Sequence, residues 1–327
     1  MLTYLVRRLI TMAFTLLIIS ALVFTIIKLP PGDYLTTYIE ELRAQGEAVN
    51  QGRIDYLRQR YGLDQPGWIQ YLNWMGGLVR GDLGWSFEYD QPVAQVIGET
   101  LVLTVILKLA TVLFIYAVAF PIGVYSATHQ YSWGDHGLTL LGFLGIAIPN
   151  FLLALMLLYF ANVWFGTSIG GLMDPTLIDK PWSWLKAKSV LEHLWAPVLV
   201  IGVTGTAGMI RRLRANLLDE LQKQYVTTAR AKGLSEGVLL RRYPLRMALN
   251  PFISDIGSLL PQLVSGAVIV SVVMSLPTSG PMLLSALQSQ DMYLAGSFLM
   301  FLSTLTVVGM FISDVALAAL DPRIRLG

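Results

Sequence analysis

The sequence contains no cysteine and only three histidines, His129, His136 and His193. Without cysteine the chain has no disulfide, no thiol nucleophile and no thiolate metal ligand. The histidines are scattered, and the segment between the first two has the composition of a turn rather than of one helix face, so they do not resemble a clustered metal-ligand set. The sequence therefore points away from thiol and metal chemistry in this chain.

Charge is scarce as well. Charged residues make up 13% of the chain and hydrophobic residues 54%, whereas about a quarter of an ordinary soluble domain is charged. These proportions indicate a polytopic membrane protein. The net charge of +2 says little because the charges are segregated by loop, and no nucleic-acid partner is expected. No Ser/His/Asp, paired-carboxylate or His-rich group lies at one membrane depth, so an enzyme is not indicated.

Long apolar runs approach the roughly 20 residues that span a bilayer. The first begins behind Arg7 and Arg8 and lacks a small-residue cleavage site, which predicts an uncleaved helix. The fourth is short and rich in Gly and Thr, which predicts close helix packing inside a bundle. The six predicted spans are 9–28, 101–127, 137–165, 195–210, 252–276 and 293–320.

Six spans place both termini on one side of the membrane. With that side inside, thirteen of the 23 Lys and Arg residues are cytoplasmic, nine of them in the loop 211–246. A cation excess of this kind holds a loop in the cytoplasm. The segment 30–97 carries five cations and nine acids, and long external segments translocate largely regardless of charge. The predicted orientation is N-in and C-in.

The segment 30–97 is patterned as a small helical cap outside the membrane. Glycine- and proline-containing breaks separate three amphipathic stretches, Tyr34–Glu47, Gln51–Tyr61 and Trp68–Val79. Its aromatic side chains suit either an interfacial belt or a ligand role; they are Trp68, Tyr71, Trp74 and Trp85. The loop 166–194 is expected on the same side.

The cytoplasmic loop has the pattern of a rigid helical projection. Asn216–Ala231 lacks Pro and Gly and is rich in helix formers, so it is predicted to continue as one helix. Gly233 would end it by adopting positive φ, and Ser235 would cap a second helix ending near Pro244. Such a projection fits a groove on a partner protein. The alternative is a loop that only sets topology, in contact with anionic lipid.

In its order of residues this loop resembles the cytoplasmic coupling segment of binding-protein-dependent ABC importer permeases. Thr-Ala-Arg-Ala-Lys-Gly-Leu at 228–234 is similar to the form in B-type subunits of the dipeptide, oligopeptide and nickel permease family. Thr227-Thr228-Ala229 stands where many importers have Glu-Ala-Ala. Short motifs extend the resemblance over nearly the whole chain: Pro31-Gly-Asp33, Gly62-Leu-Asp64, Pro66, Gln70-Tyr-Leu72, Gly81-Asp-Leu-Gly84 with Ser86, Pro149 with Phe151, His193-Leu194 with Pro197, Asn250 with Pro251, and Asp321-Pro-Arg323.

The predicted architecture is all-α, with six transmembrane helices and a small helical extracytoplasmic cap, similar to type I ABC importers. Its parts are a first transmembrane helix at 1–29, the cap at 30–97, and a five-helix permease core at 98–327 that includes the coupling loop 211–250. The resemblance implies a bacterial-type inner membrane. It also implies a second, similar permease, two cytoplasmic ATPase subunits and an extracytoplasmic solute-binding protein.

ATP chemistry is expected in the partners. The chain has no Gly-x-x-x-x-Gly-Lys-Ser/Thr motif and no Gly-Lys pair, so ATP and Mg would be bound by the ATPase subunits and no cofactor by this chain. ATP-driven closure of those subunits would drive alternating access through the loop. The residues expected to couple are Thr228, Ala229, Arg230, Lys232, Gly233 and Leu234, with peripheral charge contacts from Arg241 and Arg242.

One segment departs from the family pattern. Peptide carriers resemble Glu-x-x-Phe-x-x-Pro-Gly-x-Gly, whereas this chain has Ser271-Val-Val-Met-Ser-Leu-Pro-Thr-Ser-Gly280. Ser271 replaces the acid, Met274 the aromatic and Thr278 the first glycine. Oligopeptides are the expected solute, and oligosaccharides are the alternative because hydroxyls favour neutral, hydrogen-bonding solutes.

A secondary transporter is the rival from another class, and it would place ionisable groups deep in the bundle. Only Lys108 lies well inside a predicted span. Its side chain either snorkels to the outer interface or contacts solute. The candidate translocation-path residues are therefore Lys108, Ser271, Met274 and Thr278.

Overall fold

The computed structural model describes residues 2–30, 34–36, 64–178, 180–250 and 267–320, with single residues at 39, 43, 52, 54, 62 and 252. These residues are largely helical and hold one short antiparallel strand pair, β1 (Trp85–Ser86) with β2 (Gln91–Pro92). The all-α prediction is confirmed. The longer helices are α1 (Leu2–Lys28), α5 (Val93–Thr128), α6 (Trp133–Ala147), α7 (Asn150–Phe165), α9 (Trp195–Leu221) and α17 (Met292–Leu320). The shorter helices are α4 (Gly67–Val79), η1 (Pro175–Leu177), α8 (Trp184–His193), α10 (Gln224–Ala231), α11 (Glu236–Arg242), α12 (Pro244–Ala248), α15 (Val268–Val273) and α16 (Ser279–Gln288).

Three helices are long and apolar enough to cross a bilayer alone: Val6–Lys28 in α1, the whole of α5, and Met292–Phe311 in α17. Two bent pairs, α6 with α7 and α8 with α9, meet the same condition only together. The described residues thus supply up to five spans. The predicted run 252–276 lies largely outside the described residues, so the total of six spans stays a prediction.

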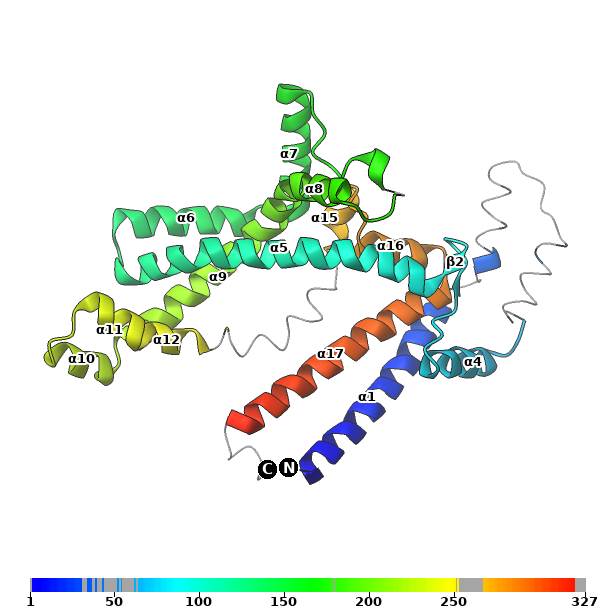
Figure 1. The fold of residues 1–327 in the computed structure, drawn as a ribbon, viewed down its shortest axis with the longest axis horizontal. Helices are drawn as coiled ribbons and strands as arrows, with labels where there is room; N and C mark the ends of the chain where they lie inside the picture. The colour runs from blue at the N-terminus through cyan, green and yellow to red at the C-terminus, as the bar shows by residue number, and fades with distance from the viewer. Residues whose placement is uncertain are drawn as a thin grey trace. The chain divides into compact units, whose positions relative to one another are not determined.

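The predicted span 137–165 is not one continuous helix. α6 ends at Ala147, and Pro149 occupies the N-cap position of α7. Proline disfavours helical backbone at the residue before it, and Ile148 is accordingly extended, with φ −87° and ψ 119°. α7 therefore leaves α6 at a bend of 95° (Figure 1).

The described chain divides into two compact units, and the boundary passes through α5. Unit 1 holds the described residues up to Thr104 and from Thr278 onward; unit 2 holds those from Val105 to Phe252 and from Ala267 to Pro277. In unit 1, α1 and α17 pack along each other (Figure 1).

Helix α4 packs on α1 and α17 within unit 1. It confirms the predicted helix Trp68–Val79, whereas the predictions for Tyr34–Glu47 and Gln51–Tyr61 fall mainly outside the described residues. The Tyr71 hydroxyl lies 2.8 Å from that of Ser20 in α1, and Trp74 Nε1 donates to Ser297 Oγ in α17 at 3.3 Å. Trp74 is only 2% exposed, so it serves packing within the chain rather than an interfacial belt.

The motif Gly81-Asp-Leu-Gly84 with Ser86 has a structural explanation in unit 1. Asp291, fully buried before α17, accepts hydrogen bonds on one oxygen from Ser86 Oγ at 2.6 Å and Phe87 N at 2.7 Å. Its other oxygen caps α17 by accepting from Leu294 N at 3.0 Å. Gly84 has φ +84° and leaves no room for a Cβ beside the Tyr293 ring. The motif therefore seats the chain after α4 on the start of α17.

Helix α9 is the centre of unit 2. A Cβ at Gly202 would lie 2.6 Å from the Phe114 ring, and one at Gly205 would lie 2.5 Å from Ile115, both in α5. The Thr204 hydroxyl reaches Gly145 O at 3.1 Å and also contacts the Asn150 side-chain oxygen, bridging the break between α6 and α7. The prediction that the Gly- and Thr-rich span is closely packed is confirmed.

Candidate functional site

The basic loop leaves α9 through a break that the sequence did not predict. The expected helix Asn216–Ala231 is interrupted: α9 ends at Leu221 and α10 begins at Gln224. Lys223 is extended, with ψ 149°, and the Tyr225 hydroxyl donates back across the break to Glu220. Burial and this hydrogen bond raise the pKa of Tyr225 to about 12. Tertiary packing overrides helix propensity here, because the turn lets Val226 become buried against Leu239.

The turn at Gly233 is a Schellman motif. Gly233 N donates to Arg230 O at 2.9 Å, and Leu234 N donates to Ala229 O at 3.3 Å. These two hydrogen bonds satisfy carbonyl groups at the end of α10. They require the residue at position 233 to adopt a left-handed conformation. Gly233 has φ +80°, as predicted, and Leu234 packs onto Ala229 to complete the motif.

A small core and one ion pair hold α10 to α11, and we call residues 224–242 the knob. Val226, Ala229 and Leu239 are buried together between the two helices. Arg230 donates from Nε to Glu236 Oε1 at 2.6 Å and from Nη2 to Oε2 at 3.1 Å. These charge-assisted bonds hold the pKa of Glu236 below its ordinary value. The knob is therefore stabilised by a buried apolar cluster inside and by an ion pair on its surface.

The knob is anchored to the rest of unit 2 through α12. Leu240 and Leu245 pack on a cluster of Ala127 from α5, Leu217 from α9 and Ala248 from α12. Ser235 stands at the N-cap of α11 as predicted, but its side chain makes no capping hydrogen bond. Figure 1 shows α10, α11 and α12 gathered at one end of α9. Packed side chains therefore join the knob to α9.

The eight predicted coupling residues have different places in the knob. Ala229 is 7% exposed and belongs to its core, and Leu234 is half-buried. Arg230 is engaged by Glu236. The other five are exposed and available to a partner; they are Thr228, Lys232, Gly233, Arg241 and Arg242. The exposed face also includes Val238, at 49% exposure, which the motif did not single out.

The candidate path residues lie in three places. Lys108 is half-buried in α5. Ser271 and Met274, in and just after α15, are each 1% exposed, and Thr278 at the N-cap of α16 is 2% exposed. The replaced positions of the family segment are therefore buried inside the chain in this conformation.

The segment 271–277 is a closed turn rather than an open loop. Leu276 N donates to Ser271 O at 2.8 Å, and Ser275 takes φ +52° where glycine is commoner. Gly171 N donates to Met274 O at 2.7 Å, which fastens the loop before η1 onto the end of α15. In unit 1, Thr104 Oγ1 accepts from Ser279 N at 2.8 Å and so satisfies the start of α16.

Two residues with structural roles, Glu236 and Asp135, were not predicted from the sequence. Glu236 sits six residues beyond Arg230 on the far side of a turn, and an acidic residue in the first turn of α11 was the available signal. Asp135 is 2% exposed and pairs with Arg214 at 3.0 and 2.8 Å, joining α6 to α9. Its position in the first turn of α6, three residues after the capping Ser132, was the signal in that case.

Long apolar helices and close glycine contacts between helices define a polytopic membrane protein, and the knob is a compact basic projection on it. Family comparison identifies which class of membrane protein this is. The chain belongs to the binding-protein-dependent transport system inner membrane components: residues 119–326 match that family, and residues 1–108 match its N-terminal region. It is thus the permease component of such a transport system.

The chain is similar over its full length to curated permeases. It is 33% identical to the oligopeptide transport system permease protein AppB of Bacillus subtilis, over 99% of this chain and 100% of that protein. It is 31% identical to a putative peptide permease of Brucella ovis over 100% of both chains. It is 28% identical to the dipeptide transport system permease DppB of Alkalihalophilus pseudofirmus over 99% of this chain and 100% of that protein.

Proposed function

We propose that this chain is one permease half of an ABC importer for oligopeptides. The observation that carries this proposal is full-length similarity to permeases named for oligopeptide, peptide and dipeptide transport. Alternating access moves the solute, and the energy comes from ATP and Mg bound by partner ATPase subunits. This chain supplies membrane helices and a coupling element, with no ATPase site of its own.

The knob is the proposed contact with the ATPase. Its small core of Val226, Ala229 and Leu239 and the Arg230–Glu236 pair support a rigid shape, and rigid shape is what a groove-binding element needs to transmit movement. The exposed residues Thr228, Lys232, Arg241 and Arg242 supply the surface. Anchoring through Leu240 carries the displacement to α9 and α5.

The proposed assembly contains a second homologous permease, two ATPase subunits and an extracytoplasmic solute-binding protein in a bacterial-type inner membrane. The chain is oriented N-in and C-in, with the cap 30–97 outside. The concentration of cations in 211–246 supports this orientation. The acidic balance of 30–97 suits a binding protein with a basic rim.

An oligosaccharide importer is the second candidate, and the hydroxyls at Ser271 and Thr278 favour it. Both side chains are buried, at 1% and 2% exposure, so they do not offer donors to a solute in this conformation. Hydroxyl content of the segment is therefore a weaker argument than similarity to named peptide permeases.

Competition for uptake decides between the two solutes. Cells carrying the complete system take up a radiolabelled short peptide, and excess unlabelled peptides should suppress that uptake while oligosaccharides should not. Cells lacking only this chain provide the background. If labelled oligosaccharide enters and only oligosaccharides compete, the peptide proposal is wrong.

A further inference from the structure

A groove between α6 and α9 in unit 2 has one polar end and one apolar side. Its volume is about 270 Å³, slightly below the roughly 300–1,000 Å³ of sites that enclose small ligands. The apolar lining includes Leu138, Phe143 and Ile146 from α6 and Ala207 and Ile210 from α9. A groove of this size suits an extended hydrocarbon chain lying along it better than it suits an enclosed solute.

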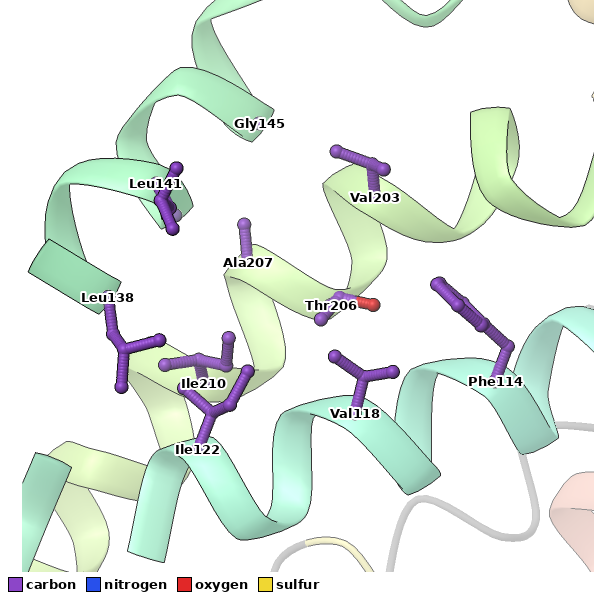
Figure 2. Close-up of a pocket in the computed structure, with 11 residues that line it drawn as sticks. Phe114, Val118, Ile122, Leu138, Leu141, Gly145, Val203, Thr206, Ala207 and Ile210 are labelled. Atoms are coloured by element: carbon purple, nitrogen blue, oxygen red, sulfur yellow. The ribbon is translucent and has the colours of Figure 1, made fainter. Parts of the chain in front are cut away.

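A second, almost wholly apolar cavity lies where the same two helices meet α5. Figure 2 shows Leu138 and Leu141 of α6, Val203 and Ile210 of α9, and Val118 of α5 around it. The two cavities share four residues, which are Leu138, Gly142, Ala207 and Ile210. Apolar surface is thus available on both sides of the α6–α9 contact.

The polar end of the groove carries unbalanced positive charge. Arg214 is neutralised by its two hydrogen bonds to Asp135. Arg211 also lines the groove and is exposed, and among the described residues it has no ion pair or hydrogen bond. His136 and Tyr131 complete this end. The guanidinium of Arg211 is therefore available to bind an anion.

Two exposed aromatic side chains indicate the depth of this polar end of the groove in the membrane. Trp133, the first residue of α6, is 94% exposed, and Tyr131 beside it is 74% exposed. Exposed Trp and Tyr at the ends of apolar helices lie at the membrane–water interface. Arg211 therefore sits at headgroup depth, and the apolar lining runs from there toward the hydrocarbon.

We propose that this groove binds an anionic phospholipid, with its phosphate at Arg211 and one acyl chain along α6 and α9. Basic sites between membrane helices select anionic headgroups in this way. The groove is open beside Gly142, where an added Cβ would meet only Ala207, at 4.0 Å. The site does not depend on which solute the permease carries or on how the ATPases engage the knob.

Native mass spectrometry of the purified complex tests the proposal with a 1:1 mixture of phosphatidylglycerol and phosphatidylcholine of identical acyl chains. The wild type should retain phosphatidylglycerol preferentially. Arg211→Gln should lower that retention about fivefold, and Gly142→Leu should lower retention of both lipids by filling the groove. Leucine is a better helix former than glycine, so α6 should be preserved.

Matched controls keep the test specific. Arg212→Gln removes the same charge from a side chain that lies over the Phe252 ring, and Gly137→Leu adds the same bulk where no atom lies within 4 Å of the new Cβ. Both should retain phosphatidylglycerol as the wild type does. Equal retention of the two lipids by the wild type, or equal losses in Arg211→Gln and Arg212→Gln, would overturn the proposal. So would a photo-crosslinker at position 142 that captures another subunit in native membranes instead of lipid.

Discussion

Arg230 and Glu236 face each other across the turn at Gly233, joined by hydrogen bonds of 2.6 and 3.1 Å from one guanidinium to both carboxylate oxygens. The ion pair joins α10 to α11 on the exposed side of the turn, while Ala229 and Leu239 pack together on its buried side. The angle between α10 and α11 is therefore held from two directions. We therefore expect Arg230 to act on coupling by positioning the knob rather than by direct contact with a partner.

The turn itself should be intolerant of a β-branched residue at Gly233. Gly233→Val forces a left-handed conformation that costs roughly 1–2 kcal/mol. Membrane insertion should survive, while ATP-driven uptake falls because α11 is displaced. Uptake by the reconstituted complex and the amount of chain in the membrane are the two measurements.

Gly237→Val is the control for added bulk. Gly237 is also exposed on the knob but lies within α11, where a Cβ meets only the end of Arg241 at 3.9 Å. It should insert normally and transport better than Gly233→Val. Equal impairment of both variants would show that surface bulk, not backbone strain, is responsible.

The ion pair predicts a pH dependence of the knob. Arg230 lowers the pKa of Glu236. The ion pair therefore stabilises the arrangement of α10 and α11 fully at any pH above the ordinary glutamate pKa of about 4.3. This stabilisation is lost only as the pH falls through the lowered pKa. Spin labels on Thr227→Cys and Val238→Cys, introduced into this cysteine-free chain, report the distance between α10 and α11. The distribution should stay narrow above the ordinary glutamate value and broaden only as the pH falls well below it.

In the same labelled chain, Glu236→Gln should give a broad distance distribution at every pH. The exchanged pair Arg230→Glu with Glu236→Arg should recover much of the narrow distribution and of the uptake lost in either single variant. If the exchange restores the distance but not uptake, Arg230 contacts the ATPase directly and the positioning role is insufficient.

Much of the architecture was predictable because its signals are local. Apolar length indicated α1, α5 and α17, and the glycine at 233 indicated the end of α10. The break at Gln222–Lys223 contains no proline or glycine; it forms because Val226 gains a buried place against Leu239. Asp291 meets Ser86 across 205 positions, and no local pattern predicts a pairing at that separation. The bend at Pro149 had a local signal in the proline itself, but the apolar length of 137–165 favoured a single span.

Topology gives a prediction that is independent of the knob. A tag at Gly327 and a protease site at Gln224 should both be reached from the cytoplasm, and a site at Gly46 only from outside, because the cation-rich loop resists translocation. Protease protection in oriented vesicles measures all three. Access to Gly46 and Gly327 from one face would contradict the six-span orientation.

The last prediction concerns Thr206, whose side chain Figure 2 shows beside the apolar cavity between α5, α6 and α9. Thr206 is 8% exposed, and among the described residues its hydroxyl has no hydrogen-bond partner. An unsatisfied buried hydroxyl costs about 1–3 kcal/mol, and valine has nearly the same shape. Thr206→Val should therefore raise the thermal unfolding temperature of the purified complex by a few degrees and leave uptake unchanged.

Thr111→Val is the matched control for that substitution. Thr111 is similarly buried, at 3% exposure, but its hydroxyl donates to Leu107 O at 2.8 Å. Removing a satisfied hydrogen bond costs about 0.5–1.5 kcal/mol, so this variant should gain no stability. A lower unfolding temperature for Thr206→Val would mean that its hydroxyl has a partner in the assembled transporter. A loss of uptake at unchanged stability would contradict the expectation that this hydroxyl plays no part in transport.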